Sequence, residues 1–330
     1  IAKAEARSPM SDKPTLLITR KLSDAVEARA ARDYDVRLNL EDQLFSPQEL
    51  LEKCQTVDAV LPCHSEIFSR DVVVELPRRL KIIANHSVGT DHCDLAALGE
   101  KGVVVTNTPD VLSDATAEIA FLLMLGAARR ASEGDRMMRA GAWDFWSPAF
   151  MVGTQTTGKR LGIIGMGRVG QVMAQRGRGF DMEIHYYNRK RLAPDKEQGA
   201  TYHENVEDLL PHCDVLSLHC PTTPETTGMM NNARFDLLPD GAIFVNTARG
   251  ALVDENALIK ALSSGKVAAA GLDVFQTEPG GNPKLSKLEN IFQQPHIGSA
   301  TFDTRNAMGF RALDNLDAFF AGNKPKDRVA

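Results

Sequence analysis

The segment RLGIIGMGRVG (residues 160–170) runs from an apolar strand pattern directly into the glycine pattern G-x-G-x-x-G. The continuation VGQVMAQRGRGF (169–180) has a helical spacing, with Val169, Val172 and Met173 as its apolar residues. A strand, a glycine turn and a helix in this order aim backbone N–H groups and the positive end of the helix at a pyrophosphate. The segment therefore predicts a dinucleotide-binding turn of the Rossmann type.

Apolar runs alternate with helical patterns on both sides of this turn, which predicts an α/β fold with parallel strands. In the first third of the chain, the expected strands are TLLIT (15–19), DAVLPC (58–63), KIIANHS (81–87) and VVVTN (103–107). From residue 160 onward, they are RLGIIG (160–165), MEIHYY (182–187), DVLSLHC (214–220), GAIFVNT (241–247) and AAAGLDVF (268–275). The segment 46–54 is an expected helix, because Ser46 can cap it and Pro47 suits its first position.

The segment between the two strand series, residues 113–141, has one long helical pattern that Ser113 or Asp114 can cap. Two α/β units joined by such a helix predict a two-lobed protein with a cleft between the lobes. A last helical pattern at 304–322 is too short for a domain, so we expect it to pack back onto the first lobe. The predicted domains are a discontinuous substrate domain (10–112 and 299–330) and an NAD(P)-binding domain (113–298). Residues 1–9 are interpreted as the remnant of an expression tag before Met10.

The bulk composition narrows the class of function. The chain has 330 residues and a formal net charge of −5, which argues against nucleic acid or an anionic membrane as the partner. No apolar run approaches the length needed to span a bilayer. The five cysteines are odd in number and lack a C-x-x-C pair, which argues against a disulfide framework and structural zinc. We therefore expect no metal and a reducing, cytoplasmic compartment.

Candidate chemical groups follow three strands of the second series, in the stretches VNTARGALVDENAL (245–258), GLDVFQTEP (271–279) and QPHIGSAT (294–301). These stretches supply Arg249, Asp273, Glu278 and His296. Taken singly, such residues have structural interpretations: a surface cation, a loop acid or a satisfied imidazole. An arginine, an acid and a histidine together at the carboxyl edge of a dinucleotide fold, where open α/β sheets bind ligands, indicate an active site.

Several motifs together resemble the D-2-hydroxyacid dehydrogenase family. Besides GMGRVG and the three stretches above, they include SVGTDHCDL (87–95) and TAEIAFLLML (116–125), and the match runs in order over most of residues 80–301. Within the family, the chain is most similar to the glyoxylate/hydroxypyruvate reductases. The resemblance implies an oxidoreductase acting on CH–OH donors. It also implies a Rossmann dinucleotide-binding domain inserted into a flavodoxin-like substrate domain, and a homodimer.

The resemblance implies a role for each candidate residue. Arg249 is expected to grip the carboxylate and keto oxygen of a small 2-keto acid, His296 to donate a proton to that oxygen, and Glu278 to hold the imidazole. The chemistry agrees, because hydride arrival at a keto carbon builds negative charge on oxygen. Formate dehydrogenases, a related branch, place glutamine where Glu278 stands, so this glutamate favours keto/hydroxy acid chemistry.

Further substrate contacts implied by the resemblance are the backbone N–H groups of Val88 and Gly89 and, from the neighbouring subunit of a homodimer, the side chain of Trp146. The alternative for Trp146 is that it packs in the core of its own chain. Beyond Arg249 and His296, the expected cofactor contacts are Thr116, Gly165, Met166, Gly167, Arg168, Val169, Gly170, Asn188, Arg189, Lys190, Cys220, Pro221, Thr226, Thr247, Ala248, Asp273 and Gly298.

One of these positions departs from the pattern of NAD-binding proteins. The strand that ends at Tyr187 is normally followed by an acid that holds the ribose 2′-hydroxyl, but here Asn188 and three cations follow. An amide does not repel a 2′-phosphate, and Arg189 and Lys190 supply charge-assisted donors to it. The sequence therefore predicts NADPH as the preferred cofactor, with NADH also usable. The alternative is a solvated basic loop.

Two other functions stay open from the sequence. One is an NAD-linked dehydrogenase that acts on another substrate, such as D-lactate or D-glycerate. The other is a dinucleotide-sensing protein like the corepressor that resembles this family. Small 2-keto acids differ by groups that a pocket discriminates by only about 1–3 kcal/mol, so the sequence leaves the exact substrate open.

Overall fold

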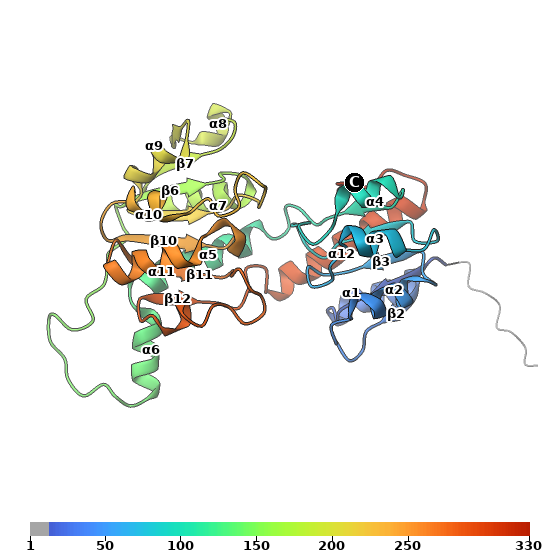
Figure 1. The fold of residues 1–330 in the computed structure, drawn as a ribbon, viewed down its shortest axis with the longest axis horizontal. Coiled ribbons are helices and arrows are strands. Elements are labelled where there is room, and N and C mark those ends of the chain that lie inside the picture. Colours follow the sequence, from blue (N-terminus) through green and yellow to red (C-terminus); the bar gives the residue numbers. More distant parts are fainter. Residues whose placement is uncertain (1–12) are drawn as a thin grey trace, which may run out of the picture. The chain divides into compact units, whose positions relative to one another are not determined.

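The computed structural model describes residues 13–330, and the interpreted tag remnant at 1–9 lies outside this range. The chain forms two compact units (Figure 1). The first holds the described residues up to Leu112 together with Thr301–Ala330, and the second is Ser113–Ala300. Each unit is built on one parallel sheet with helices, which confirms the predicted α/β fold class. In the described part of the chain, no helix is long and apolar enough to cross a membrane.

The first unit has a five-stranded sheet in the order β2-β1-β3-β4-β5, with every pairing parallel. Its strands are β1 (Thr15–Ile18), β2 (Asp35–Leu38), β3 (Ala59–Leu61), β4 (Ile82–Ala84) and β5 (Val104–Thr106). Its helices are α1 (Asp24–Asp33), α2 (Pro47–Cys54), α3 (Arg70–Glu75), α4 (Leu95–Glu100) and α12 (Phe302–Phe320). One apolar cluster joins α2, α3 and α4 to the sheet, and a second joins α1 and α12 to it. The sheet is therefore covered on both faces, as a buried parallel sheet requires.

The C-terminal helix α12 packs against β4 and α1 of the first unit. At Gly309 the helix touches α1 so closely that a Cβ would lie 2.5 Å from Val26 Cγ2. At the rim of this contact, Arg29 donates hydrogen bonds to Asp314 at 2.7 Å and Asp317 at 2.6 Å. The last helical stretch thus completes the core of the first unit, far from it in sequence.

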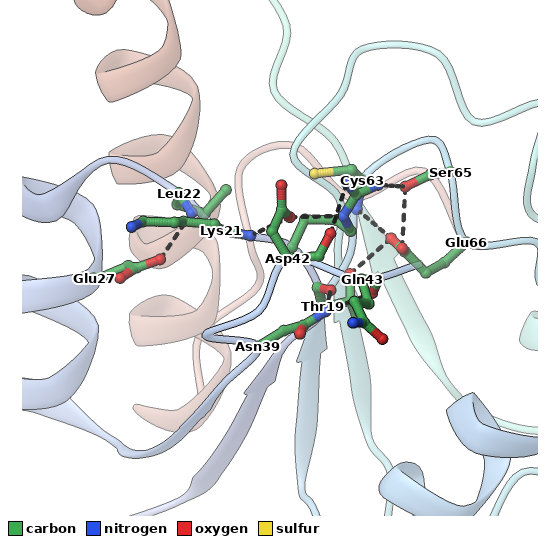
Figure 2. A network of polar contacts seen from close by, with 11 residues as sticks. Thr19, Lys21, Leu22, Glu27, Asn39, Asp42, Gln43, Cys63, Ser65 and Glu66 are labelled. Carbon is green, nitrogen blue, oxygen red and sulfur yellow. Dashed lines mark hydrogen bonds and ion pairs between the residues drawn. The ribbon is translucent and has the colours of Figure 1, made fainter. Parts of the chain in front are cut away.

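A buried carboxylate joins the loops that follow β1 and β3 (Figure 2). Glu66 is 2% exposed, and its Oε2 accepts hydrogen bonds from Thr19 Oγ1 (2.7 Å) and the Cys63 N–H (3.0 Å). Its Oε1 accepts one from Ser65 Oγ (3.0 Å), and Ser65 Oγ accepts one from Arg20 at 3.2 Å. Because a buried charge without such partners is costly, the network fixes both loops at the point where the strand order reverses.

The second unit has a seven-stranded parallel sheet in the order β12-β11-β10-β9-β6-β7-β8. Its strands are β6 (Arg160–Ile164), β7 (Glu183–Tyr187), β8 (Thr201–His203), β9 (Val215–Leu218), β10 (Ala242–Asn246), β11 (Val267–Leu272) and β12 (Ile291–Gln293). Its α-helices are α5 (Ser113–Ala128), α6 (Ala131–Arg139), α7 (Arg168–Arg178), α8 (Pro194–Glu197), α9 (Val206–Leu209), α10 (Asn232–Asp236) and α11 (Glu255–Ser264). Short 3₁₀ turns are η1 (Leu210–His212), η2 (Gly250–Leu252) and η3 (Leu285–Lys287). The strand order reverses between β6 and β9, next to the glycine turn.

The prediction of one helix over 113–141 is wrong, because the pattern forms two helices, α5 and α6. The break lies at Arg130, whose φ is +57°. At this point the carbonyl of Ala128 accepts a hydrogen bond from the Thr154 N–H at 2.8 Å, and Gly153 packs against it. A contact from a segment about 25 residues away thus ends α5, which the local pattern could not reveal.

Three strands were missed by the sequence analysis: β2, β8 and β12. Each lies at the edge of its sheet and has only three or four residues. These three strands contain polar residues, so they lack the continuous apolar run that marks the predicted strands. The strands predicted from such runs are all present, and they include one edge strand, β5.

Candidate active site

Glycines shape the turn between β6 and α7. Gly165 has a φ of +95°, and a Cβ there would lie 2.5 Å from the backbone nitrogen of Cys220, in the loop after β9. At Gly170, a Cβ would lie 2.5 Å from the carbonyl oxygen of Gly165. The residue before α7 is Gly167, so no side chain covers the start of the helix. This turn fits a pyrophosphate, which needs close backbone approach and helical N–H groups.

The basic stretch after β7 is anchored at both ends. Asn188 Oδ1 accepts a hydrogen bond from the Met166 N–H at 2.7 Å, which ties the stretch to the glycine turn. Arg191 forms an ion pair with Glu197 at 2.7 Å. The side chains of Arg189 and Lys190, between these anchors, are exposed. Arg191 is thus a structural cation, whereas Arg189 and Lys190 face solvent.

The loop after β9 lies against the same turn. Thr226 Oγ1 accepts a hydrogen bond from the Thr223 N–H at 2.7 Å and donates one to the Pro221 carbonyl at 2.9 Å. The Thr226 hydroxyl therefore holds the shape of the loop. Burial raises the pKa of the Cys220 thiol to about 11, so this residue is a neutral thiol at pH 7.

Asp273, directly after β11, holds the turn that follows β12. It is 1% exposed, and its two oxygens accept hydrogen bonds from the N–H groups of Ile297 and Gly298, each at 2.8 Å. Burial raises the pKa of Asp273, and the two N–H groups oppose that shift. A Cβ at Gly298 would lie 3.1 Å from Asp273 Oδ2 and 3.6 Å from Thr116 Oγ1. Three predicted cofactor residues from distant segments therefore meet here.

His296 precedes this turn, and Glu278 holds its ring. The Nδ1 atom of His296 lies 2.5 Å from Glu278 Oε2, and the other oxygen of Glu278 accepts a hydrogen bond from the Phe275 N–H at 2.8 Å. The two side chains are 30% and 27% exposed. Because a carboxylate accepts at Nδ1, the proton stays on that nitrogen and Nε2 points away from the acid. His296 has a φ of +54°, which is uncommon for a residue other than glycine.

Arg249 lies in the loop after β10, beside the loop that carries Glu278. A Cβ at Gly250 would lie 1.9 Å from the carbonyl carbon of Phe275, so the two loops touch backbone to backbone. Asn246 shapes the first loop, because its Oδ1 accepts from the Ala248 N–H at 3.0 Å and its Nδ2 donates to the Arg249 carbonyl at 2.9 Å. The structure therefore brings the loops of all three predicted catalytic residues together in the second unit.

The predicted substrate residues Val88 and Gly89 belong to the first unit, in the loop after β4. The Val88 carbonyl accepts a hydrogen bond from Asn107 Nδ2 at 2.8 Å, and the Gly89 carbonyl accepts one from Ser87 Oγ at 2.7 Å. In a planar trans peptide, the Gly89 N–H points opposite to the Val88 carbonyl. The hydrogen bond from Asn107 therefore fixes the Val88–Gly89 peptide with the Gly89 N–H pointing away from Asn107, at the carboxyl edge of the sheet.

Trp146 lies in a long segment between α6 and β6, which we call the aromatic arm (residues 140–153). The side chain of Trp146 is 73% exposed, so it does not pack in the core of its own chain. Trp143, Phe145 and Val152 of the arm are exposed as well. Phe145 and Phe150 pack edge to face, with ring centroids 4.8 Å apart.

The residues that hold these loops, above all Asn246, Ser87 and Asn107, were not predicted from the sequence. A signal existed for Asn246, since it is an amide at the carboxyl end of a predicted strand, directly before the arginine loop. The predicted cofactor residue Thr247 is also buried there, with Oγ1 3.5 Å from His219 Nδ1. Asn107 carried the same signal, because it ends the predicted strand 103–107, and Ser87 ends the predicted strand 81–87.

Known proteins are similar to this chain in sequence and in fold. The sequence pattern of the D-isomer specific 2-hydroxyacid dehydrogenase NAD-binding domain matches residues 121–298. A glycerate dehydrogenase from Hyphomicrobium methylovorum is 43% identical over 312 residues, covering 94% of this chain and 97% of that protein. A glyoxylate reductase from Pyrococcus furiosus is 42% identical over 322 residues, covering 96% and 95%.

Among solved structures, an NADPH-dependent glyoxylate/hydroxypyruvate reductase from Sinorhizobium meliloti, in complex with NADP and malonate, matches with a TM-score of 0.85. It is 29% identical, and the match covers 97% of both chains. The chain therefore belongs to the D-isomer specific 2-hydroxyacid dehydrogenase family. This confirms the predicted family, the Rossmann fold, the nicotinamide dinucleotide cofactor and the oxidoreductase chemistry on CH–OH groups.

The contacts of Asp273 lead to a prediction about stability. Asp273→Ala leaves the N–H groups of Ile297, which is partly buried, and Gly298, which is buried, without their acceptor. We therefore expect the free energy of unfolding to fall by about 2–5 kcal/mol. Asp273→Asn keeps one oxygen acceptor and should lose less. Chemical denaturation of the three proteins measures the order. Equal stability of Asp273→Ala and the wild type would show that the carboxylate does not hold the 297–298 turn.

Proposed function

We propose that this D-2-hydroxyacid dehydrogenase reduces small 2-keto acids such as glyoxylate and hydroxypyruvate, with NADPH as its preferred cofactor. The observation that carries the proposal is the His296–Glu278 pair, with Nδ1 2.5 Å from Oε2, beside the loop that carries Arg249. In the same unit, strand β7 is followed by basic residues where NAD-binding proteins normally have an acid. The relatives named glyoxylate reductase and glycerate dehydrogenase support substrates of this size.

The proposed mechanism assigns a proton to His296. When bound, the nicotinamide dinucleotide supplies the hydride that the keto carbon receives. As negative charge builds on the keto oxygen, His296 donates a proton to it from Nε2, the nitrogen that faces away from Glu278. Glu278 accepts a hydrogen bond from Nδ1 and so fixes the orientation of the ring. In the oxidative direction, His296 takes the same proton back.

Arg249 and the first unit are proposed to hold the substrate. The guanidinium of Arg249 carries a permanent charge, so it can bind the carboxylate and also stabilise the developing oxyanion. The Val88 and Gly89 N–H groups are proposed as further donors to the carboxylate. The side chains of Ser87 and Asn107 hold this loop through its carbonyl groups. These contacts fix the backbone without occupying the N–H groups of Val88 and Gly89.

The NADPH preference rests on the stretch after β7. Asn188 replaces the acid that would repel a 2′-phosphate, and Arg189 and Lys190 are exposed cations beside it. The Sinorhizobium meliloti reductase, whose fold matches over nearly the whole chain, is NADPH-dependent and was solved with NADP. Hydrogen bonds to a charged group contribute roughly 1.5–3 kcal/mol, so one or two favour NADPH by about ten- to several-hundred-fold.

A second candidate is an NAD-linked enzyme that oxidises D-glycerate. The observation that favours it is the 43% identity to the glycerate dehydrogenase of Hyphomicrobium methylovorum. The catalytic residues are the same for both candidates, since proton and hydride transfer are reversible. Cofactor preference and the favoured direction of turnover separate them.

The catalytic role of His296 can be tested by substitution. We expect His296→Ala to lower kcat by roughly 10²–10⁴-fold, the usual contribution of a positioned acid or base. His212→Ala, an exposed histidine in η1 of the same unit, is the matched control and should keep wild-type turnover. Near-native kcat for His296→Ala with glyoxylate and hydroxypyruvate would remove the proton-donor assignment.

The cofactor preference can be tested at Arg189. The wild type should have a higher kcat/KM with NADPH than with NADH. Arg189→Ala should have a lower kcat/KM with NADPH and an unchanged kcat/KM with NADH. Lys196→Ala removes an exposed cation in nearby α8 and serves as the control for a general change in charge. Equal efficiency of the wild type with both cofactors would support the NAD-linked candidate instead.

We also propose that the protein is a homodimer in which the aromatic arm reaches the neighbouring subunit. Exposed tryptophan and phenylalanine side chains on one segment are unusual for a surface that stays in water. Aromatic residues are enriched at protein interfaces, where they bury a large area at little entropic cost. An arm that stands away from the core of its own unit suits an exchange between subunits.

Trp146 is expected to limit the size of the substrate. Trp146→Ala should raise kcat/KM for bulkier 2-keto acids relative to glyoxylate while leaving the affinity for NADPH unchanged. Trp143→Ala, on the same arm, is the comparison for a loss of contact area alone. Unchanged relative rates across a panel of 2-keto acids would contradict this role, and a monomer in light scattering would contradict the shared arm.

A further inference from the structure

A buried acid lies directly under the basic stretch 188–192, outside the contacts already assigned. Glu197 ends the short helix α8, and only 6% of it is exposed. Its Oε1 accepts hydrogen bonds from Tyr186 Oη at 2.5 Å and Arg191 Nε at 2.7 Å. Its Oε2 accepts one from Arg191 Nη2 at 3.1 Å. Both oxygens of the acid are thus used within this group.

The phenol of Tyr186 connects the acid to the backbone of the stretch. Its ring is fully buried in the core of the second unit, and its oxygen accepts a hydrogen bond from the Leu192 N–H at 3.1 Å. The Arg191 guanidinium carbon lies 5.7 Å from the centroid of the Tyr202 ring, a cation–π distance. The Tyr202 hydroxyl donates to the Asn188 carbonyl at 3.4 Å. The end of the stretch is therefore fixed through side chains that reach into the core.

The charges of this group are set by their contacts. The hydrogen bond from Arg191, followed by that from Tyr186, lowers the pKa of Glu197. Burial raises the pKa of Tyr186 to about 12. At neutral pH the acid is therefore ionised, the phenol keeps its proton, and the charge of Arg191 is balanced. The two remaining cations, Arg189 and Lys190, are exposed at the surface.

We propose that Tyr186, Glu197 and Arg191 form a clamp that positions Arg189 and Lys190 for the 2′-phosphate of NADPH. The clamp rests on the proposed function, because it matters for binding only if the 2′-phosphate is recognised here. With Asn188 bonded to Met166 on one side and Arg191 held by Glu197 on the other, only two residues span the gap. A loop held at both ends loses less conformational freedom when it binds, which strengthens the contact. Glu197 is a positioning residue in this account and touches no cofactor atom.

The clamp can be tested with 2′,5′-ADP and 5′-AMP, which differ only by the phosphate in question. In calorimetric titrations, Glu197→Gln should weaken 2′,5′-ADP binding about tenfold, the loss expected when one charge-assisted contact is no longer held in place. Binding of 5′-AMP should stay within about twofold, since its contacts lie outside the clamp. Tyr186→Phe keeps the buried ring, removes only the hydroxyl, and should show the same selective loss.

A control variant and a second measurement separate the clamp from a loss of stability. Glu183→Gln removes one negative charge from β7, the strand that carries Tyr186, at a side chain that is 65% exposed, and should leave both affinities unchanged. Hydrogen exchange should show faster exchange of the Leu192 amide in Tyr186→Phe and Glu197→Gln, because its acceptor is removed or released. An unchanged Leu192 amide in both variants would overturn the clamp.

The outcomes also distinguish the clamp from the proposed function. If the wild type prefers 2′,5′-ADP, Arg189→Ala loses that preference, and Glu197→Gln and Tyr186→Phe keep it, the clamp is wrong and the NADPH preference stands. If the wild type binds both nucleotides equally, the NADPH preference fails and the clamp fails with it. Selective loss in all three variants supports both.

Discussion

The hold of Asp273 on the backbone of Ile297 and Gly298 is the contact on which the candidate active site depends. It joins the end of β11 to the turn after β12, and so fixes the segment that carries His296. The same segment that supplies Asp273 continues to Glu278, which reaches back to the histidine ring. One stretch of chain after a single strand therefore fixes both the backbone and the ring of the proposed proton donor.

This double hold explains how His296 keeps an unfavourable backbone. A left-handed conformation costs a residue with a Cβ roughly 1–2 kcal/mol, and it persists only where the surroundings determine it. Two charge-assisted hydrogen bonds to N–H groups and one to the ring outweigh that cost. Glycine would adopt the same backbone freely but could not donate a proton. The strain at His296 is thus a consequence of placing an imidazole where the turn would favour glycine.

Features that depend on local sterics or on short motifs were predictable from the sequence. Features that depend on contacts between segments distant in the chain were not. The glycine turn was predictable, because Gly165 and Gly170 have no room for a Cβ whatever else the fold does. The end of α5 was not, because it depends on a hydrogen bond from Thr154. Asp273 was predicted as a cofactor contact, which stays a prediction. The motif could not show that the two carboxylate oxygens of Asp273 accept hydrogen bonds from the N–H groups of Ile297 and Gly298.

Position 188 shows how a structural contact and a charge preference can favour the same residue. The Asn188 Oδ1 atom accepts a hydrogen bond from the Met166 N–H at 2.7 Å, which an aspartate could also accept. The Asn188 Nδ2 atom also donates to the Met166 carbonyl at 3.4 Å, which a carboxylate cannot do. The local structure therefore favours an amide here. Asn188 also avoids a negative charge, beside an acid, Glu197, that Arg191 already neutralises. The stretch keeps its shape, and its exposed side chains Arg189 and Lys190 carry positive charge, which suits a cofactor that carries a phosphate at this place.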